Sequence, residues 1–152
     1  MNIKKGERKM KKDTANLLRE CSAGIKMGER AISLALMHTP SGELKNTLVS
    51  AGERHAILGD EIKKLLYTER QQDKDPSPII NMMSDVKMKA ALALNGSKAT
   101  VASLITDGCN MGVKSISHYL NKYPTAGTYA QALAQKIIRT EDELRDQMKK
   151  YL

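Results

Sequence analysis

The chain has 152 residues, enough for one domain around a single hydrophobic core. Its apolar volume comes from Leu, Ile, Ala and nine Met, with no Phe, no Trp and five Tyr, and this composition favours helices over strands. No run of about 18 apolar residues is present, and the lysine-rich start leads into no apolar stretch. We therefore expect neither a membrane span nor a signal peptide, and we predict a cytoplasmic protein.

The formal net charge of +8 is concentrated at the start of the chain. Residues 1–12 carry five Lys and one Arg against Glu7, a net charge of +5. A short basic segment of this kind is typical of a disordered, solvated tail, and Met10 offers an alternative start, so that residues 1–9 need not belong to the native protein. We expect a tail over residues 1–12 and one domain over residues 13–152, and nucleic acid is not the partner that this pattern favours.

Two long helices are predicted in the first half of the chain. Residues 13–38 begin with Asp13 as a possible N-cap and end before Pro40. Residues 42–71 follow after a connection of about three residues, which predicts an antiparallel hairpin. In both segments apolar or small residues recur at spacings of three and four, as on one face of a helix. They are Leu18, Cys21, Ile25, Gly28, Ile32 and Ala35, then Leu44, Leu48, Ala51, His55, Leu58, Ile62 and Leu65.

The second half begins with a polar, Pro-bearing linker over residues 71–78. A Met-rich and Ala-rich helix is predicted over residues 79–94, and at 1.5 Å per residue it spans roughly 24 Å, nearly the length of a bundle. Two further helices are predicted over residues 98–122, capped by Ser97, and residues 126–151. Because the connecting segment can return the chain to the end it left, we predict an all-α four-helix bundle with up-down-down-up topology and a helical lengthwise crossover between its second and third helices.

Two segments resemble a known family. The stretch from Glu43 through Glu53-Arg54-His55-Ala56 to Leu66 resembles the second helix of small bacterial ferritin-like proteins of unknown function, and Asp107-Gly108 to Leu120 resembles their third. The resemblance covers about residues 13–152 and implies a ferritin-like bundle. The resemblance lies in the pattern of helices and of the apolar stripes along them, which we call seams. Such a pattern specifies the fold far better than the function.

Ferritin-like di-metal proteins take a Glu from each of two helices and a Glu-x-x-His from each of the other two. His55 lies in the predicted seam, but Gly52 stands three residues before it. Glu141 lies beside the seam at Thr140, but Leu144 stands three residues after it. The set that remains could hold one iron or manganese ion, although the paired carboxylates of a di-iron catalyst are missing. This degenerate di-metal site comprises Glu29, His55, Asp107 and Glu141.

Other features of the sequence carry little chemistry. The chain contains no GxGxxG, GxxxxGK[ST], HExxH or GxSxG pattern. Cys21 and Cys109 stand alone on apolar seams, as buried thiols rather than disulfide or metal partners. The Met-rich crossover, with Met82, Met83 and Met88, offers an adaptable apolar surface.

The sequence therefore favours a structural or protein-interaction module that is not an enzyme, binds no cofactor and associates with itself or a protein partner through exposed apolar or small-residue helix faces. One alternative is a ferritin-like metal-binding protein or oxidoreductase that holds iron or manganese. Another is a binder of acidic polymers that uses the basic residues 1–12 and loses affinity as salt rises.

Overall fold

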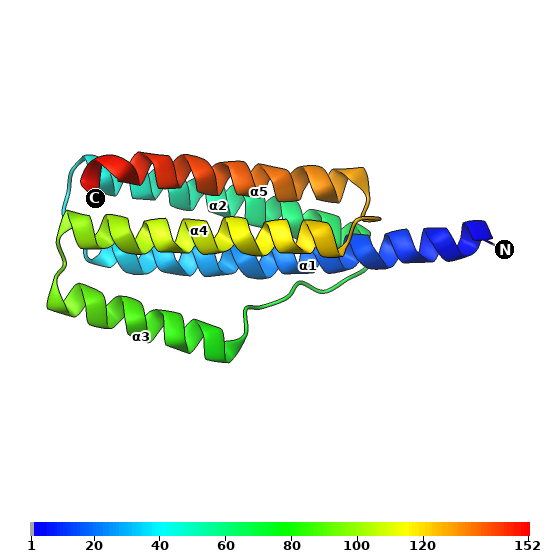
Figure 1. Ribbon diagram of the computed structural model, residues 1–152, viewed down its shortest axis with the longest axis horizontal. Helices are drawn as coiled ribbons and strands as arrows, with labels where there is room; N and C mark the ends of the chain where they lie inside the picture. The colour runs from blue at the N-terminus through cyan, green and yellow to red at the C-terminus, as the bar shows by residue number, and fades with distance from the viewer. Residues whose placement is uncertain (1) are drawn as a thin grey trace.

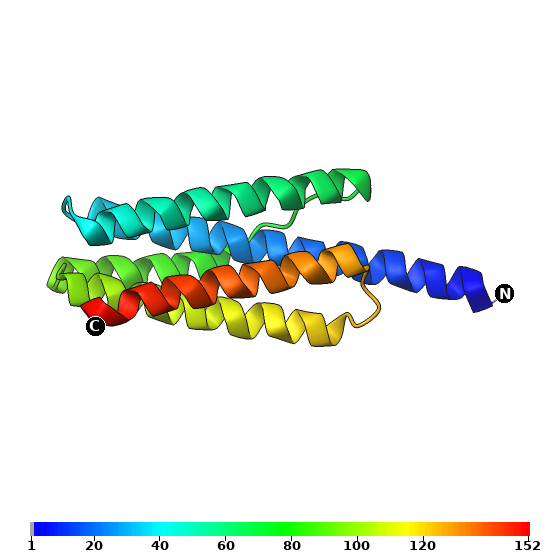
Figure 2. The ribbon, with the colours of Figure 1, turned by 90° about the horizontal axis from the view of Figure 1, so that it is seen from above.

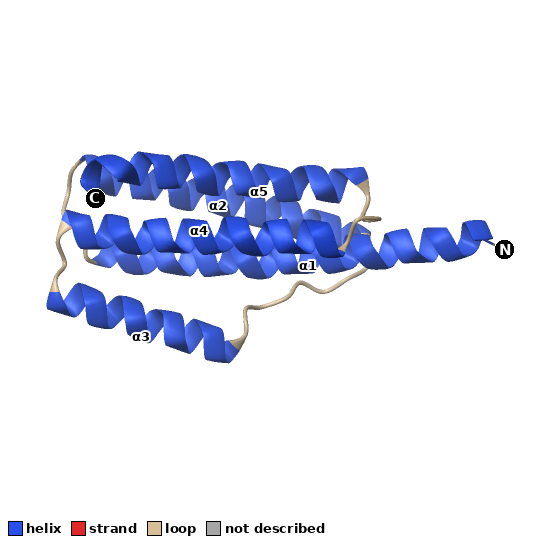
Figure 3. Cartoon of the chain, in the orientation of Figure 1, coloured by secondary structure: helices blue, strands red, loops and turns tan. Residues whose placement is uncertain are grey.

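The computed structural model describes residues 2–152, with the side chains of residues 2, 79–83 and 86 outside the description. The chain is a helical bundle, and the described residues contain no strand (Figures 1 and 3). Its helices are α1 (Asn2–Met37), α2 (Glu43–Thr68), α3 (Pro78–Leu94), α4 (Lys98–Lys122) and α5 (Thr128–Met148), followed by a 3-10 turn at Lys149–Tyr151.

The helices are arranged as two antiparallel hairpins with a fifth helix outside them. α1 packs against α2, α4 and α5, and α2 also packs against α5. Figure 1 shows that α1, α3 and α5 run in one direction while α2 and α4 run in the other. α3 lies on the outside and contacts α1 and α4. The connecting segment therefore returns the chain along the length of the bundle, as Figure 2 shows from above.

The first turns of α1 differ from the prediction of a disordered tail. α1 begins at Asn2, and these turns extend beyond the ends of the other helices in both Figure 1 and Figure 2. Residues 3–12 are exposed, and burial begins at Asp13. Lys, Arg, Met and Glu favour helix, and the packed part of α1 removes the cost of nucleating these turns. We call residues 2–12 the basic arm.

The base of the arm is tied to the loop between α4 and α5. The side chain of Asp13, predicted as an N-cap, instead accepts a hydrogen bond from the hydroxyl of Thr125. The backbone N–H of Gly127 donates to Oγ1 of Thr14 at 2.7 Å. These two contacts hold the loop against α1 at the level where the bundle begins.

The linker and α3 are fixed to α1 by ion pairs as well as by apolar contacts. Lys26 Nζ lies 2.9 Å from Asp73 and 2.6 Å from Asp75, and Arg30 forms a two-pronged contact with Asp85. Met88 and Leu92 of α3 are buried against the bundle. Of the predicted Met-rich surface, Met88 is therefore core, while the side chains of Met82 and Met83 lie outside the described residues.

The buried apolar side chains form two clusters, one toward each end of the bundle. The cluster nearer the arm includes Leu18, Ile25, Ile62 and Ile137. The cluster at the far end includes Ile32, Leu48, Ile105, Leu144 and Met148. Along every helix of the two hairpins, the two clusters are separated by about two turns, and the positions between them form a layer of different character.

Candidate functional site

Each helix of the two hairpins contributes one residue to the layer between the two apolar clusters. These residues are Gly28 of α1, His55 of α2, Gly112 of α4 and Glu141 of α5. The His55 side chain is fully buried, and Glu141 is 8% exposed. Nε2 of His55 lies 2.6 Å from Oε1 of Glu141, and Nδ1 lies 2.8 Å from the carbonyl oxygen of Ala51. We call these four residues the middle layer. At its centre lies a buried pair of titratable groups, His55 and Glu141.

The geometry of the middle layer favours the protonated form of His55. Nδ1 faces a carbonyl oxygen, which can only accept, so Nδ1 carries a proton. Nε2 faces a carboxyl oxygen of Glu141, and this contact favours the imidazolium form, in which both nitrogens donate. Burial alone lowers the pKa of His55, but the hydrogen bond and charge of Glu141, with the Ala51 carbonyl and the charge of Glu29, outweigh it. The pKa of His55 is therefore raised above its ordinary value of 6.5. A buried charge is tolerated here because it is paired and hydrogen-bonded.

The glycines of the middle layer make room for the pair. A Cβ at Gly28 would lie 2.7 Å from Cδ2 and 2.8 Å from Nε2 of His55, closer than real atoms approach. A Cβ at Gly112 would lie 3.5 Å from Cγ of Glu141, in ordinary contact. Gly28 is therefore required by the position of the imidazole, while Gly112 only leaves space beside the carboxylate. The sequence indicated small residues in these seams but not what they accommodate.

Of the four residues predicted to hold a metal, the structure brings two into direct contact. His55 and Glu141 form the buried pair. Glu29 lies beside α2, where its Oε1 would be 3.3 Å from a Cβ at Gly59, one turn beyond His55. Asp107 is exposed, because it follows the inward-facing Ile105 by two residues and is turned about 200° around the helix. The predicted set of four is therefore not assembled as one cluster.

The middle layer does not fit the metal centre that the ferritin-like pattern implies. Within the described part of the chain, no group of three or more His, Cys, Asp or Glu side chains is placed to hold a metal ion. A metal bound to both side chains would hold the His55 nitrogen and the Glu141 oxygen about 3 Å or more apart, whereas they lie 2.6 Å apart in a direct hydrogen bond. At Gly52, where the pattern places a Glu, the nearest neighbour of an added Cβ would be Ile32.

The two cysteines are separate, buried thiols, as the sequence predicted. Burial raises the pKa of Cys21 to about 12. Burial and the charge of Glu141 also raise the pKa of Cys109. Both thiols are therefore protonated near neutral pH and are poor nucleophiles and metal ligands.

Comparisons with known proteins give no further assignment: the chain matches no family model, no curated protein and no solved structure. Across residues 2–152, none of the helices combines the length and apolar character needed to cross a membrane.

Proposed function

We propose that this chain is a ferritin-like four-helix bundle, with up-down-down-up topology, in which an ion pair occupies the place of a metal centre, and that it acts as a structural or protein-interaction module. One observation carries the proposal: the middle layer contains one imidazole and one carboxylate bound directly to each other, with glycine at the facing positions of the other two helices. This arrangement satisfies the polar atoms that a metal would otherwise need as ligands.

The surface supports a role in association. Several large apolar side chains are exposed on the helices, including Val49 and Ile57 of α2 and Met111 of α4. We propose that these side chains supply contact area for a second copy of the chain or for a protein partner.

The proposal is tested by metal analysis of protein purified without a chelator and without a histidine tag. The wild type, His55→Ala and the matched control His118→Ala, which removes an exposed histidine of α4, are each incubated with ferrous iron or manganese, desalted and measured by elemental analysis. We expect no stoichiometric metal in any of the three. Stoichiometric metal that is lost in His55→Ala and kept in His118→Ala would overturn the proposal in favour of a metalloprotein.

Association is tested separately by light scattering of wild type and Val49→Glu/Ile57→Glu at several concentrations. We expect the wild type to form a defined oligomer that the double variant weakens. A wild type that stays monomeric at high concentration contradicts self-association and leaves a different protein as the partner.

A further inference from the structure

The positive charges of the basic arm lie on one side of the helix. At 100° per residue, its six cations fall within about 160° of the helix circumference. The other side of the arm holds Ile3, Gly6, Glu7 and Met10, in line with the face of α1 that packs into the bundle. The cationic stripe therefore faces away from the bundle axis. It consists of Lys4, Lys5, Arg8, Lys9, Lys11 and Lys12.

The cations of the arm differ from those farther along α1. Within the bundle, Lys26 and Arg30 are neutralised by carboxylates of the linker and α3. In the described residues, none of the six cations of the arm forms an ion pair. Lys26 and Arg30 of the packed part of α1 are thus compensated, and Arg19 is half-buried without an ion pair among the described residues. The six cations of the arm are instead exposed and uncompensated, on the part of α1 that extends beyond the other helices (Figure 1).

We propose that the basic arm binds the phosphate backbone of a nucleic-acid duplex. The arm is one straight helix of about 15 Å, the length over which a duplex presents several phosphates, since duplex DNA carries one negative charge per about 1.7 Å of its axis. A rigid helix also displays all six charges at once, without the ordering cost that a disordered tail would incur. The sequence alone predicted a disordered tail, and its composition did not favour nucleic acid as the partner. A helical arm that presents its six cations together does favour it.

The chemistry of the arm distinguishes a duplex from other anionic partners. Membrane-surface helices bury Trp, Phe or Leu on the face opposite their cations, whereas the arm offers only Ile3 and Met10 there, beside Glu7. Single-strand binders stack bases on aromatic side chains, and the first aromatic residue of this chain is Tyr67. A duplex backbone requires neither feature.

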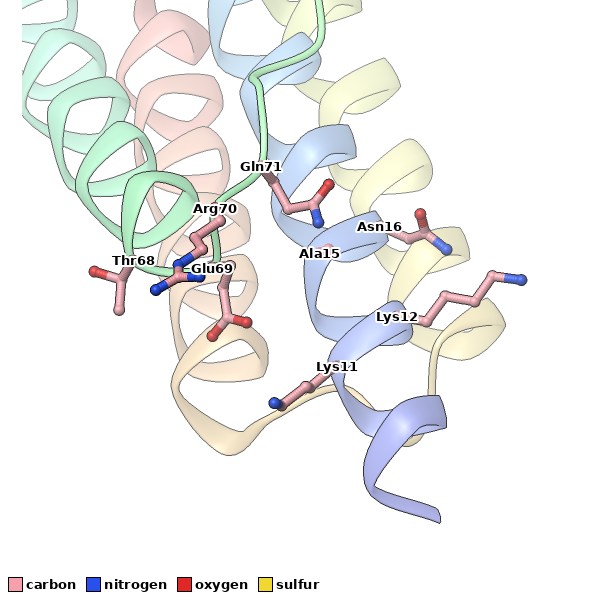
Figure 4. Close-up of a pocket in the computed structure, with 8 residues that line it drawn as sticks. All are labelled: Lys11, Lys12, Ala15, Asn16, Thr68, Glu69, Arg70 and Gln71. Carbon is pink, nitrogen blue, oxygen red and sulfur yellow. The ribbon is translucent and has the colours of Figure 1, made fainter. Parts of the chain in front are cut away.

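A small anion is also a poorer fit than a polymer. The pocket at the base of the arm, between α1 and the end of α2, is lined by Lys11, Lys12 and Arg70 together with five other residues. Figure 4 shows Lys11 and Lys12 pointing to different sides of α1 and Arg70 turned toward Thr68, so the three cations do not converge on one point. The charge is distributed along the arm, as an extended polyanion requires.

The proposal is tested by fluorescence anisotropy with labelled DNA duplexes of about 20 base pairs, using two unrelated sequences. We expect equal affinity for both, and a slope of log affinity against log salt of about −5, since each of the six phosphate contacts contributes about −0.9. Lys4→Gln/Arg8→Gln/Lys12→Gln should reduce that slope by about 3. The control Lys63→Gln/Lys64→Gln/Lys114→Gln removes the same charge from exposed positions of the bundle and should leave the slope nearly unchanged.

Two results would overturn the proposal. Equal loss of affinity in both triple variants would show that net charge, rather than the arm, attracts the duplex. Binding to phosphatidylserine vesicles without binding to either duplex would assign the arm to a membrane surface instead. Because neither assay depends on the middle layer, the outcome is independent of the metal analysis above.

Discussion

The energetic role of the buried pair can be measured with a double-mutant cycle on His55 and Glu141. Glu141→Leu would leave a fully buried imidazole with its Nε2–H unpaired, and His55→Leu would leave a carboxylate with little access to water. Removing one member of a buried ion pair costs about 3–5 kcal/mol. We expect each single variant to lose about 3 kcal/mol of the free energy of unfolding.

The double variant His55→Leu/Glu141→Leu should behave differently. Replacing both members of a buried pair by apolar residues of similar volume is close to neutral or stabilising. We therefore expect the double variant to lie within about 1 kcal/mol of the wild type, whereas the two single losses sum to about 6 kcal/mol, which gives a coupling energy of at least about 5 kcal/mol.

The assay is urea unfolding of the four proteins near pH 6, followed by circular dichroism, with the slope of each transition compared to check two-state behaviour. The reasoning would be refuted if the loss of unfolding free energy in the double variant equalled the sum of the two single losses within about 0.5 kcal/mol. Independent sites are additive to about that value. In that case the two side chains would contribute through packing alone.

Two further predictions concern the same layer. Because the pKa of His55 is raised in the folded protein, its contribution to stability is full below its ordinary value of 6.5 and is lost as pH rises through the folded value. Urea midpoints between about pH 6 and pH 8 should therefore fall in the wild type but not in the double variant, and parallel curves would show that His55 does not titrate as proposed. Gly28→Ala should gain about 1 kcal/mol of helix propensity but lose about 1–3 kcal/mol because its Cβ displaces the imidazole. Gly108→Ala, whose Cβ meets nothing within 4 Å, should be stabilised by about 1 kcal/mol, and equal stabilisation of both variants would contradict the close approach at Gly28.

The helices were largely predictable from the sequence because their seams and breaks are local. The predicted helix over residues 98–122 matches α4, and His55 is buried in the predicted seam. The predicted seam of the last helix passed through Thr140, but the structure buries Glu141 and leaves Thr140 partly exposed. Both positions fit a helical repeat, and the contact with His55, 86 residues away in sequence, could not be read from local spacing.

Two other differences have distinct physical causes. The exposure of Asp107 could have been predicted, since the periodicity that faces Ile105 inward turns Asp107 outward. The start of α1 could not have been predicted, because the side chain of Asp13, which suggested an N-cap, is hydrogen-bonded to Thr125. That residue lies in the loop between α4 and α5, 112 residues away in sequence. From local sequence alone, a polar residue of this type before an apolar repeat predicts the start of a helix.

The middle layer also restricts how the two hairpins can be assembled. Leu, Ile and Ala seams tolerate sliding of one helix past another by a turn, since one apolar residue replaces the next. With His55 on α2 and Glu141 on α5, the same slip would bury two separated charges in apolar surroundings. The pair therefore fixes the register of the second hairpin on the first, much as a single buried polar residue sets the alignment of a coiled coil.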